Sequence, residues 1–109
     1  MSQAYKVLAQ VDPVITTLTD AYTVPASTQA IISSIVIANR SATPTSFRVS
    51  IAKAGAADAT KQYIAYDEAI GANEQIVIQG GISLQTTDVV RVYATLATLS
   101  FNIFGVELS

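Results

Sequence analysis

The sequence is organised around two stretches near its C-terminal end, Asp88-Val-Val-Arg-Val-Tyr-Ala94 and Thr98-Leu-Ser-Phe-Asn-Ile-Phe104. In the second stretch apolar and polar residues alternate, which is typical of a strand with one buried face. The first stretch alternates in the same way, with Val90, Val92 and Ala94 on one face. Because residues 95–98 form only a short connection, we expect the two stretches to pair as an antiparallel hairpin.

The alternation changes phase after Ile103. Phe104, Val106 and Leu108 are apolar at even positions, whereas the strand before them is apolar at odd positions. A β-bulge near Gly105 would account for this change, because glycine adopts the backbone conformations that some bulges require.

The rest of the chain reads as further short strands separated by turns. Residues 30–38 are rich in isoleucine and valine in both phases, which predicts a strand covered on both sides, or covered on one side by a neighbouring subunit. Residues 45–52 alternate strictly, and Gly80-Gly81 reads as a turn between strands at 74–79 and 82–84. We therefore expect an all-β fold, an antiparallel β-sandwich or jelly roll of about eight short strands. The predicted core contains Leu99, Phe101, Ile103, Phe47, Val49 and Ile51.

Length and composition narrow the class of protein. A chain of 109 residues predicts a single domain over 1–109, with 21–109 as the sandwich core and 1–20 as an N-terminal arm or edge strand. Only 13% of residues are charged, against about 25% in an average soluble domain. Such a surface contacts other proteins without the cost of desolvating charges. The scattered basic residues predict no nucleic-acid partner, and the lack of a long apolar run predicts no membrane span.

The residues that usually carry catalysis are missing or scattered. The chain has no histidine and no cysteine, so it contains no Ser-His or Cys-His pair. Asp67 and Glu68 are adjacent, which on a strand places their carboxylates on opposite faces. No segment has the ligand spacing of a known calcium loop. We therefore expect no enzymatic activity, no cofactor and no bound metal.

Tyrosine offers an alternative function. Tyr63, Tyr66 and Tyr93 lie in predicted strands and could present their rings to a ligand. This pattern leaves open a monomeric sandwich that binds a carbohydrate or another small ligand. Tyrosines in strands also lie at core edges and protein interfaces.

Several strand and turn segments together resemble a family of small β-sandwich virion structural proteins of tailed bacteriophages, found as head decoration or as tail or neck components. The segments are Tyr22-Thr-Val-Pro25, Ser33-Ser-Ile-Val-Ile-Ala-Asn-Arg40, Phe47-Arg-Val49, Gly81-Ile-Ser-Leu84, Asp88-Val-Val-Arg-Val92 and Leu99-Ser-Phe-Asn-Ile-Phe-Gly-Val-Glu107. The resemblance runs from about residue 22 to the end of the chain. It implies a virion subunit without cofactors, assembled in the host cytoplasm, that forms a homo-oligomer, with a trimer favoured, and docks on other virion proteins.

Candidate assembly contacts follow from these patterns. The N-terminal arm carries a compact apolar group that could add as a strand to an exposed sheet edge. Further apolar residues come from the even-numbered positions of the isoleucine-rich strand at 30–38 and from the end of the last strand. The set is Tyr5, Val7, Leu8, Ile32, Val36 and Phe104.

Overall fold

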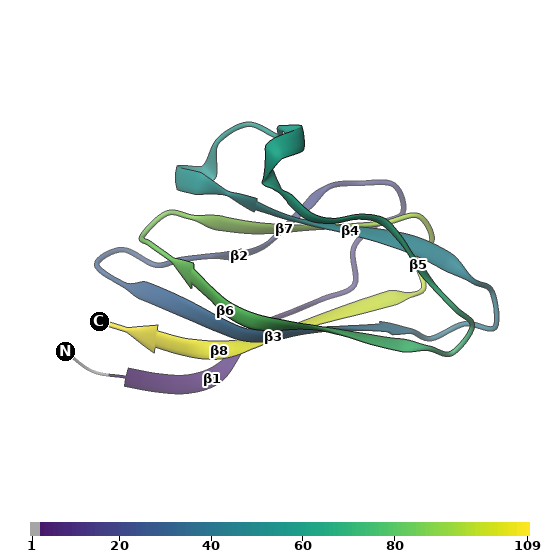
Figure 1. The fold of residues 1–109 in the computed structure, drawn as a ribbon, viewed down its shortest axis with the longest axis horizontal. Helices are drawn as coiled ribbons and strands as arrows, with labels where there is room; N and C mark the ends of the chain where they lie inside the picture. Colours follow the sequence, from purple (N-terminus) through teal and green to yellow (C-terminus); the bar gives the residue numbers. More distant parts are fainter. Residues whose placement is uncertain (1–2) are drawn as a thin grey trace.

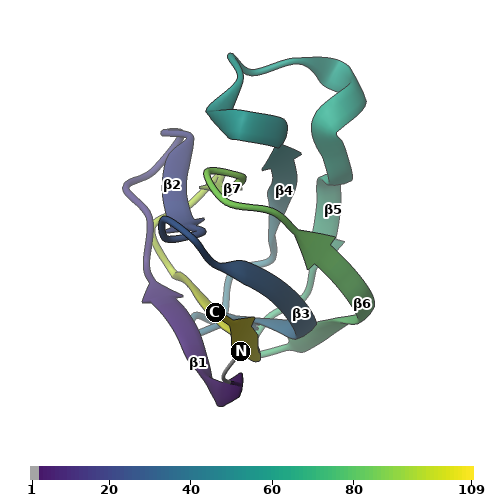
Figure 2. The same ribbon diagram turned by 90° about the vertical axis from the view of Figure 1, so that its left-hand side faces the viewer.

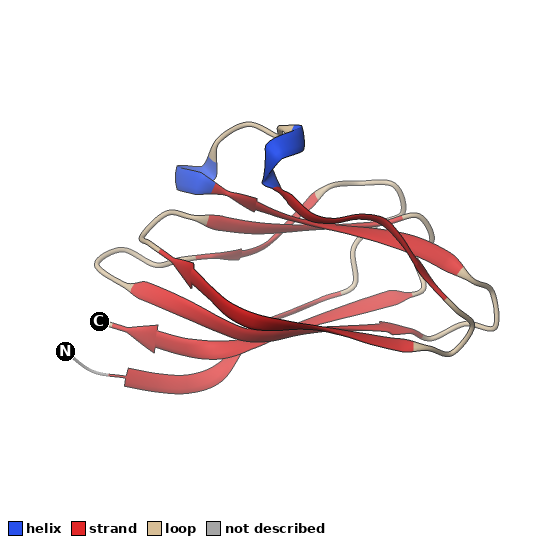
Figure 3. Cartoon of the chain, viewed as in Figure 1, coloured by secondary structure: helices blue, strands red, loops and turns tan. Residues whose placement is uncertain are grey.

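The computed structural model describes residues 3–109, and its regular elements are mostly strands (Figure 3). The strands are β1 (Gln3–Val11), β2 (Thr19–Thr23), β3 (Gln29–Asn39), β4 (Thr45–Ala52), β5 (Tyr63–Ile70), β6 (Gln75–Leu84), β7 (Val89–Ala94) and β8 (Leu99–Leu108). Two short 3₁₀ turns, η1 (Lys53–Gly55) and η2 (Thr60–Gln62), lie in the β4–β5 connection. Within the described residues, no helix has the length and hydropathy needed to cross a membrane.

The strands form two four-stranded antiparallel sheets that lie one over the other (Figures 1 and 2). Sheet A has the order β1-β8-β3-β6, and sheet B has the order β2-β7-β4-β5. The first strand pairs with the last, β2 with β7, β3 with β6 and β4 with β5. This nested pairing is that of one long antiparallel ribbon rolled into two sheets, which is the jelly-roll arrangement. The predicted all-β sandwich is therefore confirmed.

The predicted C-terminal hairpin is wrong, although both of its strands exist. β7 pairs with β2 and β4 in sheet B, whereas β8 pairs with β1 and β3 in sheet A. Residues 95–98 therefore connect one sheet to the other. Four extended residues reach about 13 Å, which is enough to cross the roughly 10 Å between packed sheets. A short connection thus does not distinguish a hairpin from an arch between sheets.

The core lies between the two sheets and contains the residues that alternation predicts. Leu99, Phe101 and Ile103 of β8 and Phe47 and Val49 of β4 are fully buried. The rings of Phe47 and Phe101 meet edge to face, with their centroids 6.1 Å apart, and so join the two sheets directly. Ile51 is partly buried and packs against this cluster.

The phase change in the last strand has a different cause from the one predicted. β8 runs without interruption through Gly105, and its neighbours carry the irregularities. The register with β1 shifts between Val7 and Ala9, and the register with β3 shifts between Ile32 and Ser34. Alternation along β8 therefore continues, and its even-numbered apolar residues face outward.

The same irregularity explains why β3 is apolar in both phases. Ile32 points into the core before the shift, and Ile35 and Ile37 point into it afterwards. Gly80-Gly81 is not a turn, because β6 continues through both glycines. Ile82 pairs with Ile32 and Gln79 with Ser34, so the two glycines lie opposite Ser33. Two residues opposite one form a β-bulge, and glycine within a strand often marks such a bulge.

The N-terminal segment is an edge strand of the fold itself. Residues 3–11 pair with β8 along its length, so that Gln3 lies opposite Leu108 (Figure 1). These residues therefore form the edge strand of sheet A, and the prediction that they also add to the edge of another protein stays a prediction. Residues 1 and 2, at the start of the predicted arm, lie outside the described residues.

The β4–β5 connection covers one end of the outer face of sheet B (Figure 1). Turn η1 contacts β7, and turn η2 contacts β4. Ser50 is on the outer face, as alternation predicts, but it is fully buried under this connection. The outer face of sheet B is thus partly covered by the chain's own loop.

Candidate assembly surface

The predicted assembly contacts all lie in sheet A, on β1, β3 and β8. Tyr5 is 80% exposed and Val7 is 46% exposed on the edge strand β1. Val36 and Phe104 are partly exposed on the two central strands. These four side chains share the outer face of the sheet. Phe104 and Val36 alternate with buried core residues along β8 and β3, and Tyr5 and Val7 pair with the outward residues Val106 and Phe104.

Two of the predicted contacts do not belong to this surface. Ile32 is fully buried in the core, so its side chain has no area to offer a partner. The register shift at Ser33 turns Ile32 inward, and the sequence alone does not reveal that shift. Leu8 is the extra residue at the shift on β1 and is partly buried against the core.

The outer face of sheet A is built from rows of side chains that cross the strands. Tyr5 pairs with Val106, and Val106 pairs with Ile31, so an apolar row crosses β1, β8 and β3. The next row contains Val7 and Phe104, which also pair with each other. Directly opposed side chains lie about 5 Å apart, close enough for continuous contact. An apolar patch therefore extends over three strands.

A third row extends the patch to the far edge of the sheet. Gln10 pairs with Asn102, Asn102 with Val36, and Val36 with Val77 on β6. The side-chain nitrogen of Gln10 donates a 2.8 Å hydrogen bond to Asn102 Oδ1. Val77 is 41% exposed and Ile31 is 36% exposed. We define the outer face of sheet A by its large apolar members, Tyr5, Val7, Ile31, Val36, Val77, Phe104, Val106 and Leu108.

Sequence reasoning did not select Ile31, Val77 or Val106. A bulge near Gly105 was the predicted explanation for the apolar phase of Val106, and Ile31 shares its phase with the core residues Ile35 and Ile37. The signal that could have found Ile31 is its position before Ser33-Ser34, since a polar pair inside an apolar strand is compatible with an inserted residue.

Charged side chains are absent from this face among the described residues. Lys6 and Glu107 are the charged residues of the four strands of sheet A. Lys6 Nζ lies 2.6 Å from Glu107 Oε1, and the Tyr22 hydroxyl of sheet B donates a 2.5 Å hydrogen bond to Glu107 Oε2. Because Glu107 bonds to a residue of the facing sheet, this cluster lies on the inner side of sheet A. The outer face is left to apolar and uncharged polar side chains.

The cluster of Lys6, Glu107 and Tyr22 shifts the pKa values of its two acidic groups, Glu107 and Tyr22. The Lys6 ammonium, and then the Tyr22 hydroxyl, hold the pKa of Glu107 below its usual value of 4.5. Burial, and then the bond to Glu107, raise the pKa of Tyr22 above its usual value of 10.0. The cluster therefore favours an ionised glutamate and a neutral tyrosine, and it ties β1 and β2 to the end of β8.

We expect Glu107→Gln to reduce the dependence of stability on acid pH. A carboxyl whose pKa is lower in the folded chain stabilises the fold fully above its unfolded pKa, and this contribution is lost as the pH falls through the folded value. The free energy of unfolding of the wild type should therefore decrease as the pH drops from about 5. Urea titrations from pH 6 to pH 3 measure this slope.

The exposed carboxyl of Glu68 provides the matched control. Glu68→Gln should keep the wild-type slope, because Glu68 is exposed on β5. An equal slope in the wild type and in Glu107→Gln would show that the Lys6–Glu107 pair contributes nothing to the pH dependence.

The outer face of sheet B differs in chemistry. The Arg48 guanidinium carbon lies 4.3 Å from the ring centre of Tyr66 and 4.5 Å from that of Tyr93. Arg48 Nε also donates a 2.6 Å hydrogen bond to Asp67 Oδ1. The Tyr63 ring meets Tyr66 edge to face, at 5.0 Å between centroids. The three predicted tyrosines are therefore brought together, around an arginine that packs on two of their rings.

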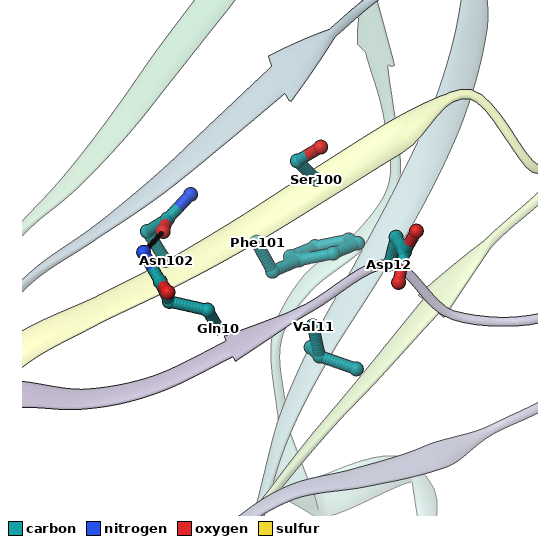
Figure 4. A pocket seen from close by; sticks show the side chains of 6 residues that line it. All are labelled: Gln10, Val11, Asp12, Ser100, Phe101 and Asn102. Atoms are coloured by element: carbon teal, nitrogen blue, oxygen red, sulfur yellow. Dashed lines mark hydrogen bonds between the residues drawn. The ribbon is translucent and has the colours of Figure 1, made fainter.

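A small pocket lies where β1 ends beside β8 (Figure 4). It has a volume of about 240 Å³ and is lined by Gln10, Val11, Asp12, Ser100, Phe101 and Asn102. Asp12 is the ionisable side chain in this lining, so the pocket does not pair an acid with a base. In residues 3–109, no three metal-binding side chains of the His, Cys, Asp and Glu types lie close enough together to hold an ion.

No family model matches this sequence, and no curated protein matches it. The resemblance to virion structural proteins therefore stays a prediction.

Proposed function

We propose that this chain is a non-enzymatic structural subunit of a tailed-phage virion, either a capsid decoration protein or a tail or neck component. It acts by associating with copies of itself and by docking on other virion proteins. The observation that carries the proposal is the uncharged, apolar outer face of sheet A. A surface of this kind is stabilised when another protein covers it.

The fold supports the same proposal. Jelly rolls occur in viral capsid domains, and also in lectins and cupins, so the fold allows a virion role without selecting it. The chain has no histidine and no cysteine, so it contains no Ser-His or Cys-His pair, and several of its charged side chains are engaged in ion pairs. Lys6 with Glu107, Arg48 with Asp67, and Arg91 with Asp20 are examples.

The composition of purified particles tests this proposal. Particles of the phage that encodes the chain are purified on a density gradient and analysed by quantitative mass spectrometry. We expect the chain at a fixed copy number relative to the major capsid protein, retained after a salt wash, because apolar contacts do not weaken with ionic strength. Intact particles that lack the chain would contradict the proposal.

A monomeric carbohydrate- or ligand-binding module is the second candidate, because Tyr63, Tyr66 and Tyr93 converge on the outer face of sheet B. Tyr66 is exposed and available to a sugar ring. Arg48, however, packs against the rings of Tyr66 and Tyr93. Glycan binding by the purified chain that is lost in Tyr66→Ala would favour this candidate over the structural role.

A further inference from the structure

We propose that a second copy of this chain packs on the outer face of sheet A, so that two sheets A lie face to face in a two-fold dimer. This inference rests on the proposed function, because it names the partner of the surface that carries it. It replaces the predicted trimer and the predicted strand addition by the N-terminal segment. Three features of the described residues support it.

First, the edges of both sheets are poorly suited to pairing with another strand. The edge strands are β1 and β6 in sheet A and β2 and β5 in sheet B. Each takes part in a pairing whose register shifts, at Val7/Ala9, Ile32/Ser34, Asp20/Tyr22 and Phe47/Val49. Bulges twist an edge away from a regular ladder and protect it from edge-to-edge association. Contact through a face is therefore favoured over extension of a sheet.

Second, the outer face of sheet A is compatible with itself. In a two-fold contact each subunit presents the same patch, so a charge near the symmetry axis meets its own copy, and an uncharged patch avoids this repulsion. The charged residues of sheet A, Lys6 and Glu107, are paired on the inner side of the sheet. Sheet B, by contrast, carries Arg48, Asp67 and Arg91 on its outer face. Sheet A therefore meets a second copy without placing like charges together.

Third, the face is large enough for a stable contact. Four strands at about 4.8 Å spacing and about nine residues in length give a face of roughly 19 by 30 Å. Its projected area is roughly 600 Å². Protruding side chains make the accessible surface larger than this projection, which brings it close to the roughly 800 Å² per partner of a standard interface. Two such faces pack about 10 Å apart with their strands rotated by roughly 30°.

Light scattering coupled to size exclusion tests the dimer. At tens of micromolar, we expect the wild type to have twice the 11.5 kDa mass of the chain. Ile31→Lys should weaken association at least about 100-fold, because a two-fold contact introduces the buried charge twice. Val77→Lys on β6 is a second variant of the same face. Ile64→Lys is the matched control, since Ile64 is 47% exposed on sheet B.

Each outcome supports or overturns the dimer, and none of them decides whether the chain belongs to the virion. A dimer that dissociates in Ile31→Lys and Val77→Lys, but not in Ile64→Lys, supports it, provided that all three variants keep the β-sheet circular dichroism of the wild type. A monomeric wild type overturns it, and so does an oligomer that both face variants leave intact. Neither of these results removes the chain from the particle, which the composition of purified virions tests independently.

Discussion

Replacing Phe101 by alanine should lower the free energy of unfolding by about 3–5 kcal/mol, the usual range for a buried aromatic side chain. Phe101 is fully buried, and its ring packs edge to face on Phe47 of the opposite sheet. The substitution therefore leaves a cavity where the two sheets are joined. A loss of this size is a large part of the roughly 5–15 kcal/mol that stabilises a typical domain. Urea titration monitored by circular dichroism measures it.

An exposed isoleucine provides the comparison. Ile64→Ala removes an apolar side chain that is half in solvent on β5, and it should change stability by no more than about 0.5 kcal/mol. If Phe101→Ala were equally mild, the inward face of β8 would be assigned incorrectly.

Gly105→Ala should destabilise the fold by about 3 kcal/mol or more, at or above the upper end of the usual cost of overpacking. A Cβ atom at this position would lie 2.2 Å from the backbone oxygen of Ile31 and 3.0 Å from the Cα of Ile32. These atoms belong to the backbone of the adjacent central strand, so they cannot rotate away as the end of a long side chain can. The β3–β8 pairing must separate locally to admit one methyl group.

Gly81→Ala is the matched control for this prediction. Gly81 also lies within a strand of sheet A, but a Cβ atom there would have no neighbour within 4 Å. Its substitution should change the free energy of unfolding by less than about 1 kcal/mol. Equal effects at the two glycines would indicate that the close contact between β8 and β3 is absent.

Local alternation predicts most of the strands and most of the core, although it divides β6 at Gly80-Gly81. Phe47, Val49, Leu99, Phe101 and Ile103 are buried as their spacing indicates, because a strand repeats every two residues whatever its partners are. The choice of partner is not local. The short connection 95–98 is compatible with a hairpin and with an arch between sheets, and only the nested pairing of all eight strands decides between them.

The assembly surface was predicted only in part, for a related reason. The inward or outward direction of Ile31 and Ile32 depends on one inserted residue, Ser33, and the pairing register rather than the composition reveals it. Similarly, the packing of Arg48 on the rings of Tyr66 and Tyr93 involves residues of three strands. Such a contact cannot be predicted from the spacing of residues within one segment.

The most direct test of the central claim asks whether the outer face of sheet A is covered in solution. The chain has no cysteine, so a single cysteine placed at Ile31 or Ile64 reports on its own surroundings through its rate of reaction with a thiol reagent. We predict that labelling of Ile31→Cys slows progressively as the protein concentration rises through the association range, whereas labelling of Ile64→Cys stays constant. Constant rates at both positions, or equal slowing at both, would contradict assembly through this face.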